Sequence, residues 1–292
     1  MQTAAGPLAP VFGGRPRVFC CHSATLSGRC LPNSLAAVTE CVAANVPRLE
    51  VDLQFLADDT MLIFHDAAFE LATDGAGRVA DSTWQTVRDF RYSDGSPIAV
   101  MGEVVDAIRG SDAILQVDLK LSRPMTAPRA ALLKDALAPV RDHVLVGSQA
   151  HWNLRPFAGD FPVALDPTLH WSFSRRPPGL PRTLGVHGLW DDAPIAGNPR
   201  FTASEYVDAR IDDLVGILPA AVEWMVDIET IFHFETLGIA LGDALAARGL
   251  SLAAWTLRSD EPAMRTVLER LFRLGVETVI TDAAPAAAAS LL

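Results

Sequence analysis

Two carboxylates and a histidine that lie close together in the sequence are the residues best suited to do chemistry. Glu50 and Asp52 are separated by one apolar residue, and His65 follows them. Side chains alternate between the two faces of a β-strand, so Glu50 and Asp52 are expected to point the same way. Carboxylate oxygens are the ligands that hard divalent cations prefer. The segment therefore predicts an oxygen-ligated metal site beside an imidazole.

The residues between these groups predict a β-hairpin. Two apolar runs meet at Asp58 and Asp59, a pair suited to a tight turn. If these two residues form the turn, the register sets His65 opposite Asp52. Opposite partners share a face, so the hairpin would bring the imidazole to the carboxylates.

A second charged pair, Asp118 and Lys120, repeats the same spacing inside an apolar run. A strand that is buried in a parallel sheet is normally apolar throughout. Buried charges need partners or a metal ion. Asp118 and Lys120 are therefore candidate site residues.

The elements that must position these residues alternate between short β-branched runs and helical stretches. This alternation is typical of parallel strands joined by helical crossovers. A chain of 292 residues, half of them hydrophobic, is long enough for an α/β barrel, which commonly forms one domain. We therefore predict a single (β/α)8 TIM barrel over residues 1–292. Its strands are expected at Arg17–Cys21, Arg48–Leu53, Ile114–Leu119, Val144–Gly147, Pro162–Leu165, either Thr183–His187 or Val222–Val226, Ser251–Thr256 and Glu277–Thr281.

Helix start and stop signals fall between these strands. Asn33 is expected to be the N-cap of the first predicted helix. Residues 173–200 are rich in proline and too long for a simple connection, so we predict a mobile loop or lid there. The expected helices are Ser34–Ala44, Phe234–Arg248, Glu261–Leu274 and a closing helix at Ala283–Leu292.

The polar residues of interest share one position in this scheme, at or just past the carboxyl end of a strand. Barrel active sites lie on that rim. The residues are His22, Glu50, Asp52, Asp118, Lys120, Trp255 and Asp282.

Composition limits the partners. The net charge is −11, and the 24 Lys and Arg residues are scattered, which argues against nucleic acid as a partner. No long uncharged apolar run and no leader pattern are found, so we expect a cytoplasmic chain without stable membrane insertion. The four cysteines lack a zinc spacing and are expected as free thiols, with a Cys30–Cys41 disulfide as the alternative. The oligomeric state is left open.

In the order and spacing of its motifs, the chain resembles the glycerophosphodiester phosphodiesterase family. These proteins are TIM barrels of the wider phosphatidylinositol-phospholipase-C-like group. The segments that carry the resemblance are His22, Leu49-Glu50-Val51-Asp52, Phe64-His65-Asp66, Thr73-Asp74-Gly75, Asp118-Leu119-Lys120, Ala254-Trp255-Thr256 and Ile280-Thr281-Asp282.

The resemblance implies a metal-dependent hydrolase of small-molecule phosphodiesters. Glu50, Asp52 and Asp118 would hold one divalent cation, Mg²⁺ or Ca²⁺, because three carboxylates suit a hard ion. His22 and His65 would act as general acid and base, since imidazole titrates near working pH. The products would be glycerol 3-phosphate and an alcohol. Which histidine is the acid, and whether water or a substrate hydroxyl attacks, stays open.

Three further residues are candidates for catalysis or substrate binding. Lys120 would stabilise the transition state electrostatically, or it forms a barrel salt bridge with Asp118. Trp255 would pack on the carbon skeleton of the substrate, or it fills the barrel. Arg29 is a candidate for substrate binding in the loop after the first strand.

The chain departs from the family pattern next to His22. The family reads His-Arg-Gly where this chain has His22-Ser23-Ala24, so the arginine that would grip the phosphate is absent. Arg29 or Lys120 would have to replace it, although an ammonium is not equivalent to a guanidinium.

The missing arginine, together with Asp118 in place of the more usual Glu before Lys120, also resembles the sphingomyelinase D and phospholipase D toxin-like enzymes. That similarity implies an alternative, a lyase that forms cyclic phosphates from lysolipids. A barrel that binds phosphate without catalysis is a third hypothesis. Retention of both histidines favours an enzyme, because a binder has no need for two proton-transfer groups.

Overall fold

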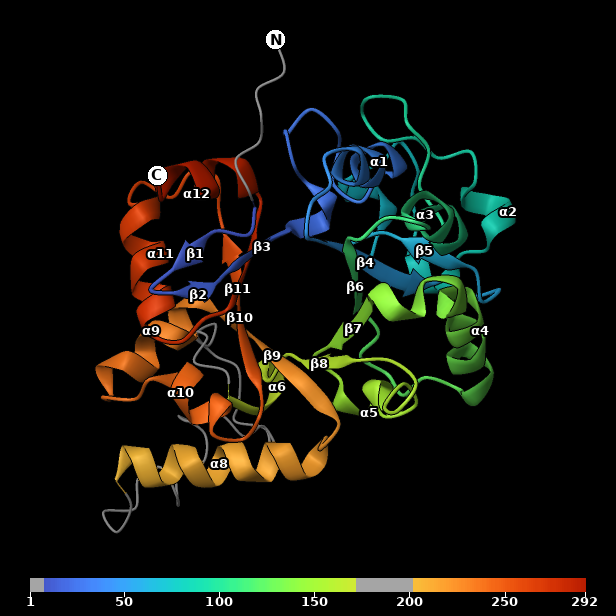
Figure 1. The fold of residues 1–292 in the computed structure, drawn as a ribbon. Helices are drawn as coiled ribbons and strands as arrows, with labels where there is room; N and C mark the ends of the chain where they lie inside the picture. Colours follow the sequence, from blue (N-terminus) through green and yellow to red (C-terminus); the bar gives the residue numbers. More distant parts are fainter. Residues whose placement is uncertain (1–7, 172–201) are drawn as a thin grey trace, which may run out of the picture.

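Eight parallel strands form a closed barrel in the computed structural model, which describes residues 8–171 and 202–292 (Figure 1). The strands follow each other around the barrel in sequence order, and the ring closes because β3 pairs with both β4 and β11. The predicted (β/α)8 barrel is confirmed. The strands are β3 (Val18–Cys21), β4 (Arg48–Phe55), β6 (Ile114–Leu119), β7 (Val144–Ser148), β8 (Val163–Leu165), β9 (Ala221–Asp227), β10 (Ser251–Leu257) and β11 (Thr278–Thr281).

The sixth barrel strand is β9, which contains the predicted Val222–Val226. The alternative strand Thr183–His187 and the predicted loop or lid at 173–200 lie outside the described residues.

Helices surround the barrel, with α3 and α4 on one side and α11 and α12 on the other (Figure 1). Among the described residues, no helix has the length and apolar character that crossing a membrane requires. The helices are α1 (Leu35–Ala43), α2 (Trp84–Val87), α3 (Met101–Ile108), α4 (Ala127–Leu137), α5 (His151–Leu154), α6 (Thr168–Trp171), α8 (Ala203–Ile217), α9 (Ile228–Thr236), α10 (Leu241–Ala246), α11 (Met264–Arg273) and α12 (Ala284–Ser290).

Two helix predictions need correction. The predicted helix Phe234–Arg248 is two helices, α9 and α10, because Gly238 adopts a left-handed backbone with φ of 77° and ends the first. The cap of α1 is Ser34, whose side chain accepts a hydrogen bond from the backbone N–H of Ala37. Asn33 was the predicted cap, but its side chain is engaged elsewhere, as described below.

The hairpin after β4 also has a different register from the predicted one. Strand β5 (Met61–Ile63) pairs antiparallel with β4, and the backbone N–H of Phe64 donates to the carbonyl of Asp52 over 2.9 Å. Phe64, not His65, therefore lies opposite Asp52. The turn contains one more residue than predicted, since Asp59 has a left-handed φ of 65°. A shift of one residue exchanges the two faces of a strand.

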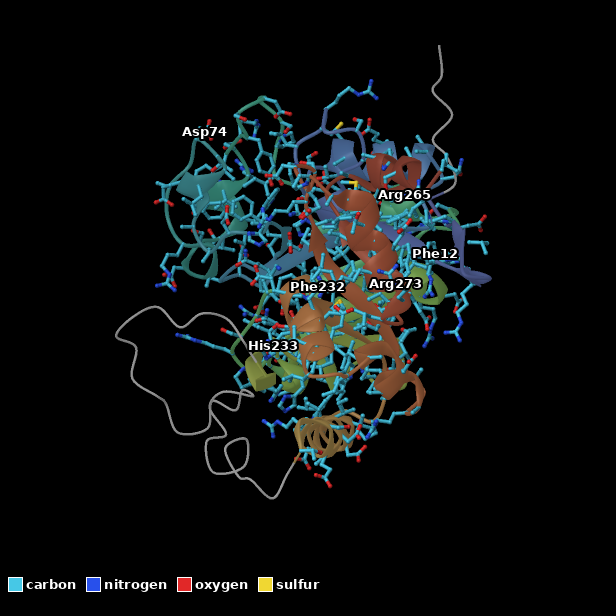
Figure 2. The ribbon with its side chains drawn as sticks, turned by 90° about the vertical axis from the view of Figure 1, so that its left-hand side faces the viewer. Phe12, Asp74, Phe232, His233, Arg265 and Arg273 are labelled. Carbon is cyan, nitrogen blue, oxygen red and sulfur yellow. The ribbon has the colours of Figure 1, made fainter. Side chains whose placement is uncertain are left out.

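Apolar side chains pack in two layers, one between the barrel and its helices and one inside the barrel. On the outer surface, Phe12 of strand β1 (Val11–Phe12) lies over Phe272 of α11, with ring centroids 5.2 Å apart. Strand β1 pairs antiparallel with strand β2 (Arg15–Pro16) to form a small two-stranded sheet. Figure 2 labels Phe12 near Arg273 of α11, and Asp74 on the opposite part of the molecule.

The segment that contains Asp74 runs from β5 to α3 and has a separate small core. Phe64 and Phe69 pack there with Tyr92, and the rings of Phe64 and Phe69 lie 5.3 Å apart. This segment lies beside the barrel rim and forms one wall of a cavity described below.

The barrel interior is divided between an apolar half and a polar half. Strands β3 and β7 to β11 contribute the apolar residues Cys20, Leu145, Ala164, Met225, Ala253 and Ile280. Strands β4 and β6, together with Glu223 of β9, contribute polar ones. Arg48 donates two hydrogen bonds to the carboxylate of Glu223, at 3.0 and 2.6 Å, and two to Gln116. All four cysteines are free thiols, so the Cys30–Cys41 alternative is not formed.

Replacing Glu223 with Gln should lower the free energy of unfolding by about 3 kcal/mol, because Arg48 would remain buried without a countercharge. Urea denaturation followed by circular dichroism measures the change. Asp81→Asn is the control, since Asp81 pairs with Arg78 at the exposed surface and its loss should leave stability nearly unchanged. Equal losses in the two variants would contradict the role of the buried pair.

Candidate functional site

Three carboxylates converge at the carboxyl ends of β4 and β6. Glu50 and Asp52 both point into the barrel mouth, and the parallel register sets Asp52 beside Asp118 of the neighbouring strand. Glu50 and Asp52 are buried and Asp118 is partly buried. Oxygen atoms of the three side chains lie within 4.8 Å of one another. This is the cluster that the sequence spacing predicted.

Only one ammonium group contacts this cluster among the described residues. Lys120 Nζ lies 2.9 Å from Asp52 Oδ1 and 2.7 Å from Asp118 Oδ2. Burial, and then the charge of Asp52, raise the pKa of Glu50 to about 8. The ammonium of Lys120 alone does not balance the three carboxylates when all of them are ionised at this close range. A donor set of carboxylate oxygens with surplus negative charge fits a hard divalent cation.

Two residues that the sequence did not identify hold the carboxylates in place. The backbone N–H of Ser23 donates to Glu50 Oε2 over 2.7 Å, and its hydroxyl donates to Asp52 Oδ2 over 3.2 Å. Asn33 donates from Nδ2 to Asp52 Oδ2 over 2.6 Å and accepts from the Asp52 backbone N–H. Both residues have left-handed backbones, with φ of 47° and 61°. Ser23 thus supports the cluster at the position where the family carries arginine.

Both predicted histidines lie beside the cluster, and each is paired with a carboxylate. His22 Nδ1 lies 2.6 Å from Asp282 Oδ1, and His65 Nδ1 lies 2.9 Å from Asp66 Oδ1. Burial opposes protonation of His22, but the bond to Asp282 and the nearby carboxylates raise its pKa to about 9. His65 reaches the site from the loop after β5 and not through the predicted strand pairing.

Two cavities meet at these histidines. The first, of about 340 Å³, is lined by Glu50, Asp118 and Lys120 together with both histidines, and we call it the polar cavity. The second, of about 760 Å³, also borders both histidines and extends over the segment between β5 and α3. We call it the larger cavity.

The remaining predicted substrate-binding residues are placed differently. Trp255, on β10, lines the polar cavity. Arg29 lies outside both cavities: its side chain is 82% exposed and pairs with Glu40 over 3.0 Å. The structure therefore does not bring Arg29 to the cluster, because the loop after β3 directs it outward.

Arg258 is a cation that the sequence did not identify. It follows the end of β10 and lines the polar cavity. Its side chain makes no ion pair within the described ranges 8–171 and 202–292. Its position directly after Leu257, at the end of a strand, is the feature of the sequence that could have predicted it as a site residue.

Comparison with known proteins assigns the chain to a family. The family model described as "Glycerophosphoryl diester phosphodiesterase family" matches residues 25–285. The chain belongs to this family. It is also 36% identical over 56 residues to glycerophosphodiester phosphodiesterase 1 of Bos taurus and 32% identical to the Homo sapiens protein. That match covers 19% of this chain and 17% of each relative.

Solved structures with the same fold cover nearly the whole chain. An Oleispira antarctica phosphodiesterase, in complex with the product sn-glycerol-3-phosphate, superimposes with a TM-score of 0.64. The match has 15% identity and covers 94% of this chain and 96% of that one. A glycerophosphodiester phosphodiesterase of Parabacteroides distasonis matches with a TM-score of 0.65 and 13% identity, over 94% and 95% of the two chains.

Replacing Glu50 with Gln distinguishes a metal ligand from a structural carboxylate. Without added metal, and at a pH above the Glu50 pKa of about 8, the variant should unfold at a higher temperature than the wild type, because one of three clustered carboxylate charges is removed. Its affinity for Mg²⁺ or Ca²⁺ should fall by about tenfold or more, because a charged oxygen ligand is lost. Differential scanning calorimetry and titration calorimetry measure the two effects.

Glu40→Gln is the matched control, because Glu40 lies on α1 and pairs with Arg29 away from the cluster. Unchanged cation affinity in Glu50→Gln would remove Glu50 from the metal site.

Proposed function

We propose that this chain is a metal-dependent phosphodiesterase that hydrolyses glycerophosphodiesters to glycerol 3-phosphate and an alcohol. The observation that carries the proposal is the cluster of Glu50, Asp52 and Asp118 beside a cavity that is lined by two of these carboxylates, one lysine and two carboxylate-paired histidines. Membership of the family and the sn-glycerol-3-phosphate complex of the Oleispira antarctica enzyme support the substrate class.

Glu50, Asp52 and Asp118 would hold the divalent cation, Mg²⁺ or Ca²⁺. When bound, the ion supplies Lewis-acid neutralisation of the non-bridging phosphate oxygens. Ser23 and Asn33 keep the ligand oxygens oriented through the hydrogen bonds already described. Such outer partners fix the direction in which a ligand presents its lone pairs.

The two histidines provide proton transfer. Asp282 and Asp66 each engage the Nδ1 atom of their histidine, which leaves Nε2 of each ring for the substrate. In hydrolysis, one imidazole removes a proton from the attacking water while the other protonates the alkoxide that leaves phosphorus. The carboxylate partners orient the rings and stabilise the imidazolium form.

Two cations meet the remaining phosphate charge. Lys120 is held at the cluster by Asp52 and Asp118. Arg258, on the other side of the polar cavity, supplies the guanidinium that position 23 lacks. Charge stabilisation of this kind is usually the largest catalytic contribution.

His22→Ala and His65→Ala should each lower the turnover number by about 100-fold or more, because a proton-transfer group is lost. Phosphorus NMR with glycerophosphocholine and Mg²⁺ or Ca²⁺ measures the product. Cation affinity should stay near wild type, and both variants should remain folded. His143→Ala is the control, since His143 precedes β7 at the opposite end of the barrel.

If the wild type forms a cyclic phosphate from lysophosphatidylcholine, the reaction is that of a lyase and the proposed hydrolysis is wrong. Metal-dependent binding without turnover of either substrate would favour a binding barrel. Turnover that survives both histidine substitutions would contradict the proposed catalysis.

Arg258→Gln should lower kcat/KM for glycerophosphocholine by about tenfold or more, because the guanidinium that meets the phosphate is lost. Arg29→Gln should leave it unchanged. Both substitutions remove one positive charge, so the comparison controls for net charge. A larger loss in Arg29→Gln would assign the phosphate-binding role to Arg29, as the sequence suggested.

A further inference from the structure

The polar cavity has a wall that the proposed chemistry leaves without a role. Asp166 follows β8 directly and Gln149 follows β7, so both lie on the same rim as the carboxylate cluster. Asp166 is only 7% exposed, yet it borders the cavity. A buried carboxylate is costly unless its oxygens accept hydrogen bonds.

Neutral donors hold Asp166 in place. Oδ1 accepts hydrogen bonds from the backbone N–H and the hydroxyl of Thr168, and Oδ2 accepts one from Gln149 Nε2 over 3.1 Å. Asp166 has no Lys, Arg or His within ion-pair distance in the described part of the chain. A carboxylate has about four acceptor positions, so Asp166 retains capacity for further donors. Burial raises its pKa to about 6, so it is ionised at neutral pH.

The position of Asp166 around the barrel fits one substituent of a bound phosphodiester. Asp118 on β6 is in register with Gly147 on β7, and Ser148 is in register with Leu165 on β8. Asp166 thus lies two strands from the cluster on the same rim. Asp118 and Asp166 line the same cavity, so a substituent that leaves a phosphate at the cluster in the direction of β7 would meet this wall.

The larger cavity is less suited than the polar cavity to recognise hydroxyl groups. Its acidic side chains Glu70 and Asp74 are exposed to water, which competes for their oxygens, whereas Asp166 is buried. Leu71, which is 75% exposed, adds an apolar edge. Hydroxyl recognition is therefore better matched by the polar cavity.

We infer that Asp166, supported by Gln149, is the subsite that recognises the glycerol hydroxyls of the substrate. The inference rests on the proposed function and adds a specificity determinant to it. The carboxylate accepts hydrogen bonds from the hydroxyl groups, while Gln149 fixes the orientation of the carboxylate. A site built to accept a substrate hydroxyl discriminates strongly against analogues that lack it, because its buried acceptor would be left unpaired.

Titration calorimetry with sn-glycerol 3-phosphate and methyl phosphate tests this subsite, with Mg²⁺ or Ca²⁺ present. Both ligands carry the phosphate, but only the first carries hydroxyls. The wild type should bind sn-glycerol 3-phosphate about tenfold or more tightly than methyl phosphate. Asp166→Asn should remove most of this preference and leave methyl phosphate affinity unchanged.

Asp160→Asn is the matched control, because Asp160 precedes β8 at the other end of the barrel and pairs with Lys134. Gln149→Leu should also reduce the preference, and it replaces Asp166→Asn if that variant does not fold. A preference that persists in the folded variants would overturn the inference. So would an equal loss of affinity for both ligands, because that would mark a structural role.

Failure of the proposed function gives a different result. It would appear as absence of glycerophosphocholine hydrolysis by the wild type, whichever phosphate binds. Absence of the wild-type preference, with hydrolysis intact, would overturn the glycerol subsite alone.

Discussion

Unbalanced negative charge inside the barrel mouth is the constraint on which the site depends. Glu50, Asp52 and Asp118 lie together where water is largely excluded, and Lys120 offsets only part of their charge. Ser23 and Asn33 then fix the carboxylates at short range. Such an arrangement is unfavourable for folding alone, because buried like charges repel. A divalent cation bound there would offset the repulsion, which would link cation binding to stability.

The barrel separates the charged half of its interior from the apolar half. Below the cluster, Arg48 and Glu223 neutralise each other, and Gln116 accepts the remaining hydrogen bonds of the guanidinium. The carboxylate cluster above has no such internal balance. The Arg48–Glu223 pair is therefore neutralised within the protein. The carboxylate cluster at the rim is the part of the interior whose charge a ligand can neutralise. The histidines and Arg258 lie around that cluster, where the strands end.

Strand alternation made much of this architecture predictable from the sequence. The spacing of Glu50 with Asp52 sets both on one face, and the apolar run around Asp118 marks it as an interior group. The hairpin register was not predictable, because one left-handed residue, Asp59, adds a position to the turn.

The roles of other loop residues depend on contacts across the barrel. Asn33 was predicted as a helix cap, but its amide bonds Asp52, a partner that the pairing of β3 with β4 brings near. Arg258 and Asp166 lie just past strand ends, and their common cavity depends on pairing between strands. The direction of the loop that carries Arg29 likewise follows from tertiary packing.

Anomalous diffraction from crystals grown with CaCl₂ tests the metal centre most directly. The account predicts one calcium peak with an oxygen of each of Glu50, Asp52 and Asp118 at about 2.3 to 2.6 Å. Calcium bound elsewhere, with none among these three side chains at millimolar concentration, would contradict it.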